Sequence, residues 1–195
     1  MTITLEEKMK QTWEKYQSLC ERLGDENIDI FLEIMGERLL MCPASLRENE
    51  YNSRPGGLVE HALDVALAMK SINETLKLGV STSSILKVGL LHEIGKIGDE
   101  ENDWVVEQDS EWHRNNLKQN YKYNEGAAKM SISHRTLYLL QKFGIKLTQD
   151  EWIAIQIAPG SHYEENRFYV GAEPTLGALI QKAKSLVIHK STIKN

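Results

Sequence analysis

The sequence contains no long apolar run, and this absence argues against one class of protein. A membrane-spanning helix needs roughly 20 consecutive apolar residues, and no segment of the 195-residue chain approaches that length. The chain opens Met1-Thr2-Ile3-Thr4 and leads directly into a charged segment, which does not fit a signal peptide. We therefore expect a cytoplasmic protein without a membrane anchor.

Cysteine is scarce, and basic residues are not in excess. Cys20 and Cys42 are the only cysteines, and their spacing fits neither a zinc site nor a disulfide framework, so we expect reduced thiols in the core. The 23 Lys and Arg residues stand against 28 Asp and Glu residues, a formal charge of −5. Because a protein that holds duplex nucleic acid needs a basic face, we expect no broad duplex-binding surface.

Strand signals are almost absent, whereas helix signals recur along the chain. Thr4 with Glu7, and Thr148 with Glu151, have the spacing of capping boxes that begin helices. Apolar residues recur with helical periodicity, which predicts helices over residues 5–23, 27–41, 58–76, 85–97, 131–143, 148–158 and 174–187. In the second of these, Ile30 and Ile34 are expected to be buried together with Phe31 and Met35.

Two polar stretches interrupt the helical pattern. The segment RENEYNSRPGG, residues 47–57, is rich in turn formers and predicts a loop or junction. It divides the chain into N-terminal helices over residues 1–46, packed on the core, and a helical domain over residues 47–195. Residues 100–130 are polar but contain Trp104, Trp112 and Tyr121, which suggests an ordered functional loop.

Two histidines fall on neighbouring helices that should be buried. His61 lies at the edge of an apolar stripe, and His92 is followed at once by Glu93 and then by Lys96. Either histidine alone is most simply a hydrogen-bonded core residue. A histidine, a carboxylate and a lysine on an otherwise apolar helix are costly to bury without a shared role, and a bound cation would satisfy the first two.

The residues around these histidines resemble a known family. GGLVEHALDVA (56–66) and GLLHEIGKIGD (89–99) resemble the first two motifs of the HD-domain metal-dependent phosphohydrolases. The downstream segments 109–125 and 132–155 are similar to a branch common among bacteriophage-encoded HD proteins, so the resemblance covers roughly residues 55–189. It implies an all-α fold, an HD-domain helical bundle with an N-terminal helical extension. It also implies hydrolysis of a nucleotide or another phosphate ester.

The resemblance implies roles for individual residues. His61 and His92 match metal ligands, and Glu93 stands where aspartate is usual. The cofactor would be a divalent cation, with Mn, Mg, Fe, Ni and Zn not distinguished. Glu93 and Lys96 would act in catalysis, the lysine by offsetting negative charge that develops on the phosphate.

The last helix departs from the family pattern. Lys184 occupies the position expected to supply a final aspartate, and an ammonium beside a divalent cation is repulsive. His162 is our first candidate for a replacement ligand, with Asp64 and His189 as alternatives. Otherwise the site holds no metal, and the chain is a degenerate HD scaffold that binds a nucleotide or a protein partner without hydrolysis. In that case Lys184 should point toward Glu93.

Substrate contacts are expected in the polar stretch that follows the second motif. Its basic side chains could grip a phosphate while Trp112 or Tyr121 stacks on a base, or they could form an ordinary solvated loop face. These side chains are His113, Arg114, Lys118 and Lys122. Homo-oligomerisation is left open.

Overall fold

The computed structural model describes residues 4–193, so the expectation for Met1 to Ile3 lies outside the described residues. Within this range helices predominate, with only one small two-stranded sheet, and the expected all-α class is confirmed. The elements run α1 (Leu5–Glu21), α2 (Glu26–Met41), α3 (Gly57–Leu76), α4 (Thr82–Leu91), η1 (Ile94–Ile97), β1 (Val105–Glu107), α5 (Glu111–Leu117), β2 (Tyr121–Tyr123), α6 (Ile132–Lys142), α7 (Gln149–Ile157), η2 (Glu164–Tyr169) and α8 (Thr175–Ile193). None of the described helices is long and apolar enough to cross a membrane.

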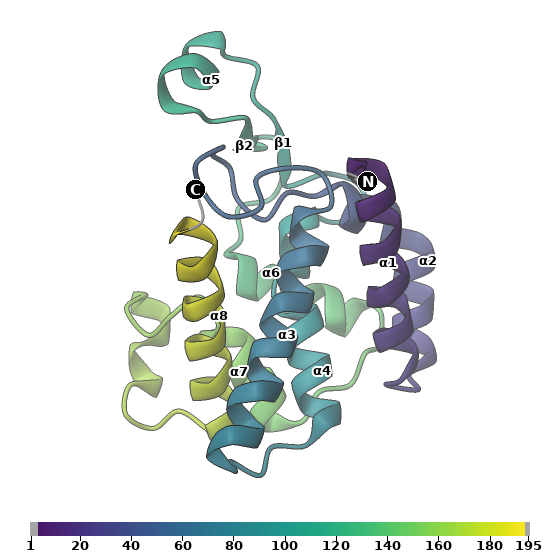
Figure 1. The fold of residues 1–195 in the computed structure, drawn as a ribbon, viewed down its shortest axis with the longest axis vertical. Helices are drawn as coiled ribbons and strands as arrows, with labels where there is room; N and C mark the ends of the chain where they lie inside the picture. Colours follow the sequence, from purple (N-terminus) through teal and green to yellow (C-terminus); the bar gives the residue numbers. More distant parts are fainter. Residues whose placement is uncertain (1–3, 194–195) are drawn as a thin grey trace.

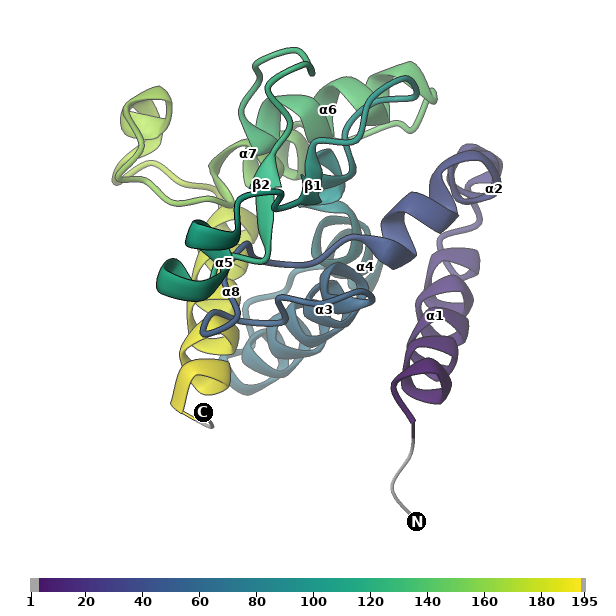
Figure 2. The ribbon, with the colours of Figure 1, turned by 90° about the horizontal axis from the view of Figure 1, so that it is seen from above.

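The helices form a bundle with an arm at one end. Helices α3, α4, α7 and α8 pack against one another, and α1 and α2 lie along one side of the bundle (Figure 1). The arm contains β1, α5 and β2 and projects from the end of the bundle (Figure 1). Seen from above, the segment that contains η2 extends on the side opposite α1 and α2 (Figure 2). The capping boxes at Thr4 and Thr148 are both formed.

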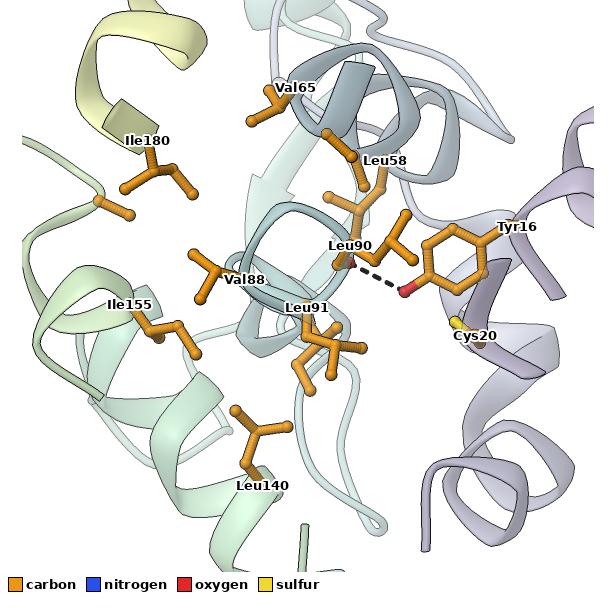
Figure 3. Packing of buried hydrophobic residues seen from close by; sticks show 14 of the residues in the cluster. Tyr16, Cys20, Leu58, Val65, Val88, Leu90, Leu91, Leu140, Ile155 and Ile180 are labelled. Atoms are coloured by element: carbon orange, nitrogen blue, oxygen red, sulfur yellow. Dashed lines mark hydrogen bonds between the residues drawn. The ribbon is translucent and has the colours of Figure 1, made fainter. Parts of the chain in front are cut away.

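One hydrophobic cluster joins the helices. It includes Tyr16, Cys20 and Phe31 from the N-terminal helices together with Leu90 and Ile180 from α4 and α8. Figure 3 shows side chains of this cluster converging from both sides of α4. Both cysteines are buried and free, as expected. The N-terminal helices therefore share their core with the remainder of the chain.

The hydroxyl of Tyr16 donates a buried hydrogen bond of 2.9 Å to the carbonyl of Leu90 (Figure 3). That carbonyl lies in the last turn of α4, where backbone acceptors lack helical partners. We expect Tyr16→Phe to lower the free energy of unfolding by about 1 to 3 kcal/mol, because it leaves a buried acceptor unsatisfied. Urea unfolding would measure this. Tyr163→Phe, at a half-exposed tyrosine, is the control and should change stability by less than about 0.5 kcal/mol.

The expected helix over residues 85–97 is wrong in its second half. Helix α4 ends at Leu91, and a 3-10 turn, η1, follows from Ile94. Thr136 on α6 explains the break, because its hydroxyl accepts a hydrogen bond from the Gly95 amide at 2.9 Å and donates to the His92 carbonyl at 3.3 Å. A Cβ at Gly95 would lie 2.3 Å from a backbone oxygen of α6, so glycine permits this close approach.

The expected buried face of α2 is also partly wrong. Ile30 and Ile34 are 47% and 56% exposed. The buried residues of α2 are Ile28, Phe31, Met35, Gly36 and Leu39. This face is rotated from the expected one, because α2 packs against both α1 and α3.

The polar stretch over residues 100–130 is folded, but it contains a pair of short strands, joined through α5, that the sequence did not indicate. Strands β1 and β2 pair antiparallel, with Val105 opposite Tyr123. Trp104 stacks on Tyr123 with ring centroids 5.0 Å apart, and the Arg135 guanidinium lies 4.0 Å from the Trp104 ring. These aromatic contacts fix the base of the arm to α6.

Candidate functional site

A close approach of α3 and α4 brings the two histidines together. A Cβ at Gly89 would lie 2.8 Å from Ala66, so the missing side chain lets the two helices pack tightly. The rings of His61 on α3 and His92 at the end of α4 have centroids 6.1 Å apart. Because α4 ends here, Glu93 leaves the helix and is placed beside them.

His61, His92 and Glu93 form a buried cluster. One ligand atom from each lies within 4.8 Å of the others, and the residues are at most 5% exposed. The expectation that these side chains converge is confirmed. The distance from His61 Nε2 to Glu93 Oε2 is 3.8 Å. A group of this composition could hold a metal ion.

Two lysines reach the same carboxylate. Lys96 Nζ lies 2.7 Å from Glu93 Oε2, and Lys184 Nζ, from α8, lies 2.6 Å from Glu93 Oε1. Lys96 also donates to the Ala44 carbonyl at 2.5 Å. Each carboxylate oxygen therefore already has an ammonium partner. We call these five residues (His61, His92, Glu93, Lys96 and Lys184) the central cluster.

The charges of this cluster follow from burial and pairing. Burial alone would disfavour the Glu93 carboxylate, but Lys184 and Lys96 outweigh it and hold the pKa of Glu93 well below its usual range. Burial opposes the charge on Lys96 as well, but the adjacent Glu93 carboxylate raises the pKa of this lysine overall. Glu93 and Lys96 are thus both charged at neutral pH.

Both histidines are neutral. Burial lowers the pKa of His61 to about 3 and that of His92 to about 4, although Glu93 acts in the opposite direction in each case. His92 Nδ1 lies 3.0 Å from the Gly89 carbonyl, so Nδ1 carries the proton and Nε2 is left as an acceptor. This Nε2 and both ring nitrogens of His61 are buried without a hydrogen-bond partner.

The cluster fits a metal ion only in part. The unpartnered histidine nitrogens are suitable ligands, and buried polar atoms without partners are uncommon in proteins. The carboxylate is not suitable as arranged, because an ammonium group contacts each of its oxygens. The two lysines and Glu93 together carry a net charge of +1, which favours an anion over a cation.

A cleft of about 610 Å³ opens onto the cluster. His92, Glu93, Lys96 and Lys184 line it at the bundle. The remaining walls include basic and aromatic side chains and come from the loop after α2, from the arm and from the segment before η2: Arg47, Tyr51, Gln119, Tyr123, Ala158, Pro159 and Tyr163. The side chains of Ala158 and Pro159 have no polar atom, so they can neither coordinate a metal nor hydrogen-bond to a bound molecule. The volume lies within the range of small-molecule sites, about 300 to 1,000 Å³.

The four basic residues expected to bind substrate lie on the arm and do not line this cleft. Lys122 pairs with Asp109 at 2.7 Å, Arg114 donates to the Gln108 carbonyl at 2.5 Å, and His113 contacts Ser110. Lys118 is exposed at the end of α5. Their role in binding stays a prediction. The arm contributes Gln119 and Tyr123 to the cleft instead, and only the pairing of β1 with β2 reveals this.

The candidate replacement ligands lie outside the cluster. His162 is exposed, and its ring packs on Tyr163 with centroids 4.3 Å apart. Asp64 is exposed on α3 and lines a different cavity, and His189 is exposed on α8. None of the three belongs to the group of potential ligands found among residues 4–193.

Comparison of the chain with family models, with curated proteins and with solved structures gives no match. The family resemblance therefore depends on the sequence alone, on the motifs at residues 56–66 and 89–99 and on the downstream segments 109–125 and 132–155.

Proposed function

We propose that this chain is an HD-type scaffold in which Lys184 has closed the metal centre, and that it binds a nucleotide or a similar phosphorylated small molecule without hydrolysing it. The observation that carries this proposal is the 2.6 Å contact between Lys184 Nζ and Glu93 Oε1. Lys184 stands where the resemblance implies an aspartate ligand. Its ammonium takes up one carboxylate oxygen, and Lys96 takes up the other.

The cleft has the chemistry of an anion site with an aromatic wall. The basic residues Arg47, Lys96 and Lys184 line the cleft against two carboxylates, Glu50 and Glu93, so its formal charge is +1. Charged hydrogen bonds from such groups are the usual means of holding a phosphate. Tyr123 and Tyr163, both half-exposed, line the cleft and offer ring faces on which a base can stack. This combination supports a nucleotide as the ligand class.

Calorimetric titration with ATP and AMP tests the proposal. We expect binding without release of phosphate, with or without Mn²⁺. Lys184→Met should weaken binding about tenfold, because a hydrogen bond to a charged group is worth about 1.5 to 3 kcal/mol. Lys182→Met is the matched control, since Lys182 is an exposed lysine on the same helix that does not line the cleft. Equal affinities of the two variants would contradict the proposal.

A second candidate, a metal-dependent phosphohydrolase at the same cluster, is favoured by the unpartnered nitrogens of His61 and His92. A divalent cation there would supply Lewis-acid activation of a phosphate ester. Elemental analysis after dialysis without chelator separates the two candidates. Stoichiometric metal together with turnover of a phosphate ester would favour the hydrolase.

Lys184→Asp provides a further test of the closed centre. The substitution removes the ammonium and adds a carboxylate to a His/His/Glu set, so we expect a gain of at least about tenfold in Mn²⁺ affinity. Calorimetric titration of wild type and variant with MnCl₂ measures the gain, and Lys182→Asp is the control for general charge. Tight Mn²⁺ binding by the wild type, unchanged in Lys184→Asp, would show that Lys184 does not close the site.

A further inference from the structure

A second cavity, of about 700 Å³, lies between α3 and α8 beneath the loop that follows residue 47. It shares only Glu50 and Tyr51 with the lining of the first cleft. His61 lines this second cavity, whereas His92, Glu93, Lys96 and Lys184 do not. Its volume is in the range of small-molecule sites. The cavity is therefore a separate candidate site on the other side of His61.

Two buried polar groups on this cavity lack partners. Ser53 Oγ and His61 Nδ1 are buried and make no hydrogen bond with any described residue, and the His61 side chain is only 1% exposed. Native proteins rarely leave such atoms unsatisfied. A ligand that carries its own hydrogen-bonding group would satisfy them.

The charge of the cavity is negative. Glu48, Glu50, Glu60 and Asp64 line it against the basic Arg54 and Lys190. Arg54 already pairs with Glu60, and Glu60 also accepts from Lys8 at 2.9 Å. The three remaining carboxylates, those of Glu48, Glu50 and Asp64, outnumber the single remaining base, Lys190. The cavity is thus complementary to a cation, in contrast to the first cleft.

Asp64 is the carboxylate best placed to meet such a cation. It forms no hydrogen bond or ion pair with another described side chain. Although Asp64 is exposed as a residue, partial desolvation of its carboxyl group, together with the neighbouring Glu60, raises its pKa. An ammonium ligand would relieve both effects. Leu67 on α3 and Leu186 on α8 line the same cavity and are 59% and 57% exposed, so they provide an apolar wall.

We propose that the cavity between α3 and α8 is a second ligand site, which takes a small organic cation with an apolar body. The ammonium group lies at Asp64, and the apolar body packs between Leu67 and Leu186. This site uses none of the lysines on which the proposed function depends, so each proposal can fail without the other.

Tryptamine and indole-3-propionate are matched probes, because they share a ring and a two-carbon arm but carry opposite charges. We expect tryptamine to bind the wild type in calorimetric titration and indole-3-propionate to bind at least ten times more weakly. Asp64→Asn should weaken tryptamine binding about tenfold. Lys190→Gln should strengthen it, because a repulsive charge is removed. Leu67→Gln should weaken it through loss of apolar contact.

Asp29→Asn, at an exposed acid on α2, is the control and should leave tryptamine affinity unchanged. Lys184→Asp should also leave it unchanged, which separates this site from the first cleft. Circular dichroism establishes that each variant is folded. The proposal is overturned if tryptamine does not bind at millimolar concentration or if the two probes bind equally. Unchanged tryptamine affinity in both Asp64→Asn and Lys190→Gln would also overturn it.

Discussion

Glu93→Ala should lower the free energy of unfolding by about 3 to 5 kcal/mol, the range measured when one partner of a buried ion pair is removed. Glu93 is 5% exposed and Lys96 is 6% exposed, so both groups are largely removed from water even though they line the cleft. The substitution would leave two ammonium groups facing each other across the vacated carboxylate. Urea unfolding followed by circular dichroism at neutral pH measures the loss.

Two controls separate charge pairing from simple loss of volume. Glu33→Ala, on the exposed face of α2, should change stability by no more than about 0.5 kcal/mol. Glu93→Met combined with Lys96→Met and Lys184→Met should recover most of the lost stability, because replacing a whole buried ionic group by apolar residues is often neutral. If Glu93→Ala stays within about 1 kcal/mol of the wild type, the lysines have other partners and the ionic group is not integral to the fold.

The sequence indicated most of the residues that form the central cluster, but it did not indicate how their side chains are arranged. The motifs placed His61, His92 and Glu93 together, and they did converge. The alignment with the family motif placed Lys184 in the expected aspartate position, and its ammonium does contact Glu93. No pattern in the sequence indicated that Lys96 would reach the other oxygen of the same carboxylate and also the Ala44 carbonyl. That arrangement depends on α4 ending at Leu91.

Local signals were reliable where they act within one turn of helix. The capping boxes at Thr4 and Thr148 formed because donor and acceptor lie three residues apart. Features set by contacts distant in sequence were missed. Thr136 on α6 interrupts the expected helix at His92, and neighbouring helices determine which face of α2 is buried. The strands β1 and β2 span three residues each, too few for a periodic signal, so the contribution of Tyr123 to the cleft could not be predicted.

Acid should destabilise the protein strongly because both histidines of the cluster are buried in the neutral form. Their pKa values are lowered to about 3 for His61 and about 4 for His92, against about 6.5 for an unfolded chain. At a pH between the folded and the unfolded pKa of a histidine, the unfolded state binds more protons than the folded state. The free energy of unfolding therefore falls as the pH falls. The contribution of each histidine is complete above about pH 6.5 and is lost progressively toward pH 4 and below.

Lowering the pH from 7.5 to 5 should reduce the free energy of unfolding by about 2 kcal/mol for each histidine. The wild type should therefore lose about 4 kcal/mol of stability over this range. Glu93 adds to the loss at lower pH, because its folded pKa is also depressed and the unfolded carboxylate takes up a proton first. Urea unfolding at the two pH values measures the difference. His61→Met removes one of the two groups and should halve the loss. A loss of the same size in His61→Met as in the wild type would show that the acid sensitivity arises elsewhere in the chain.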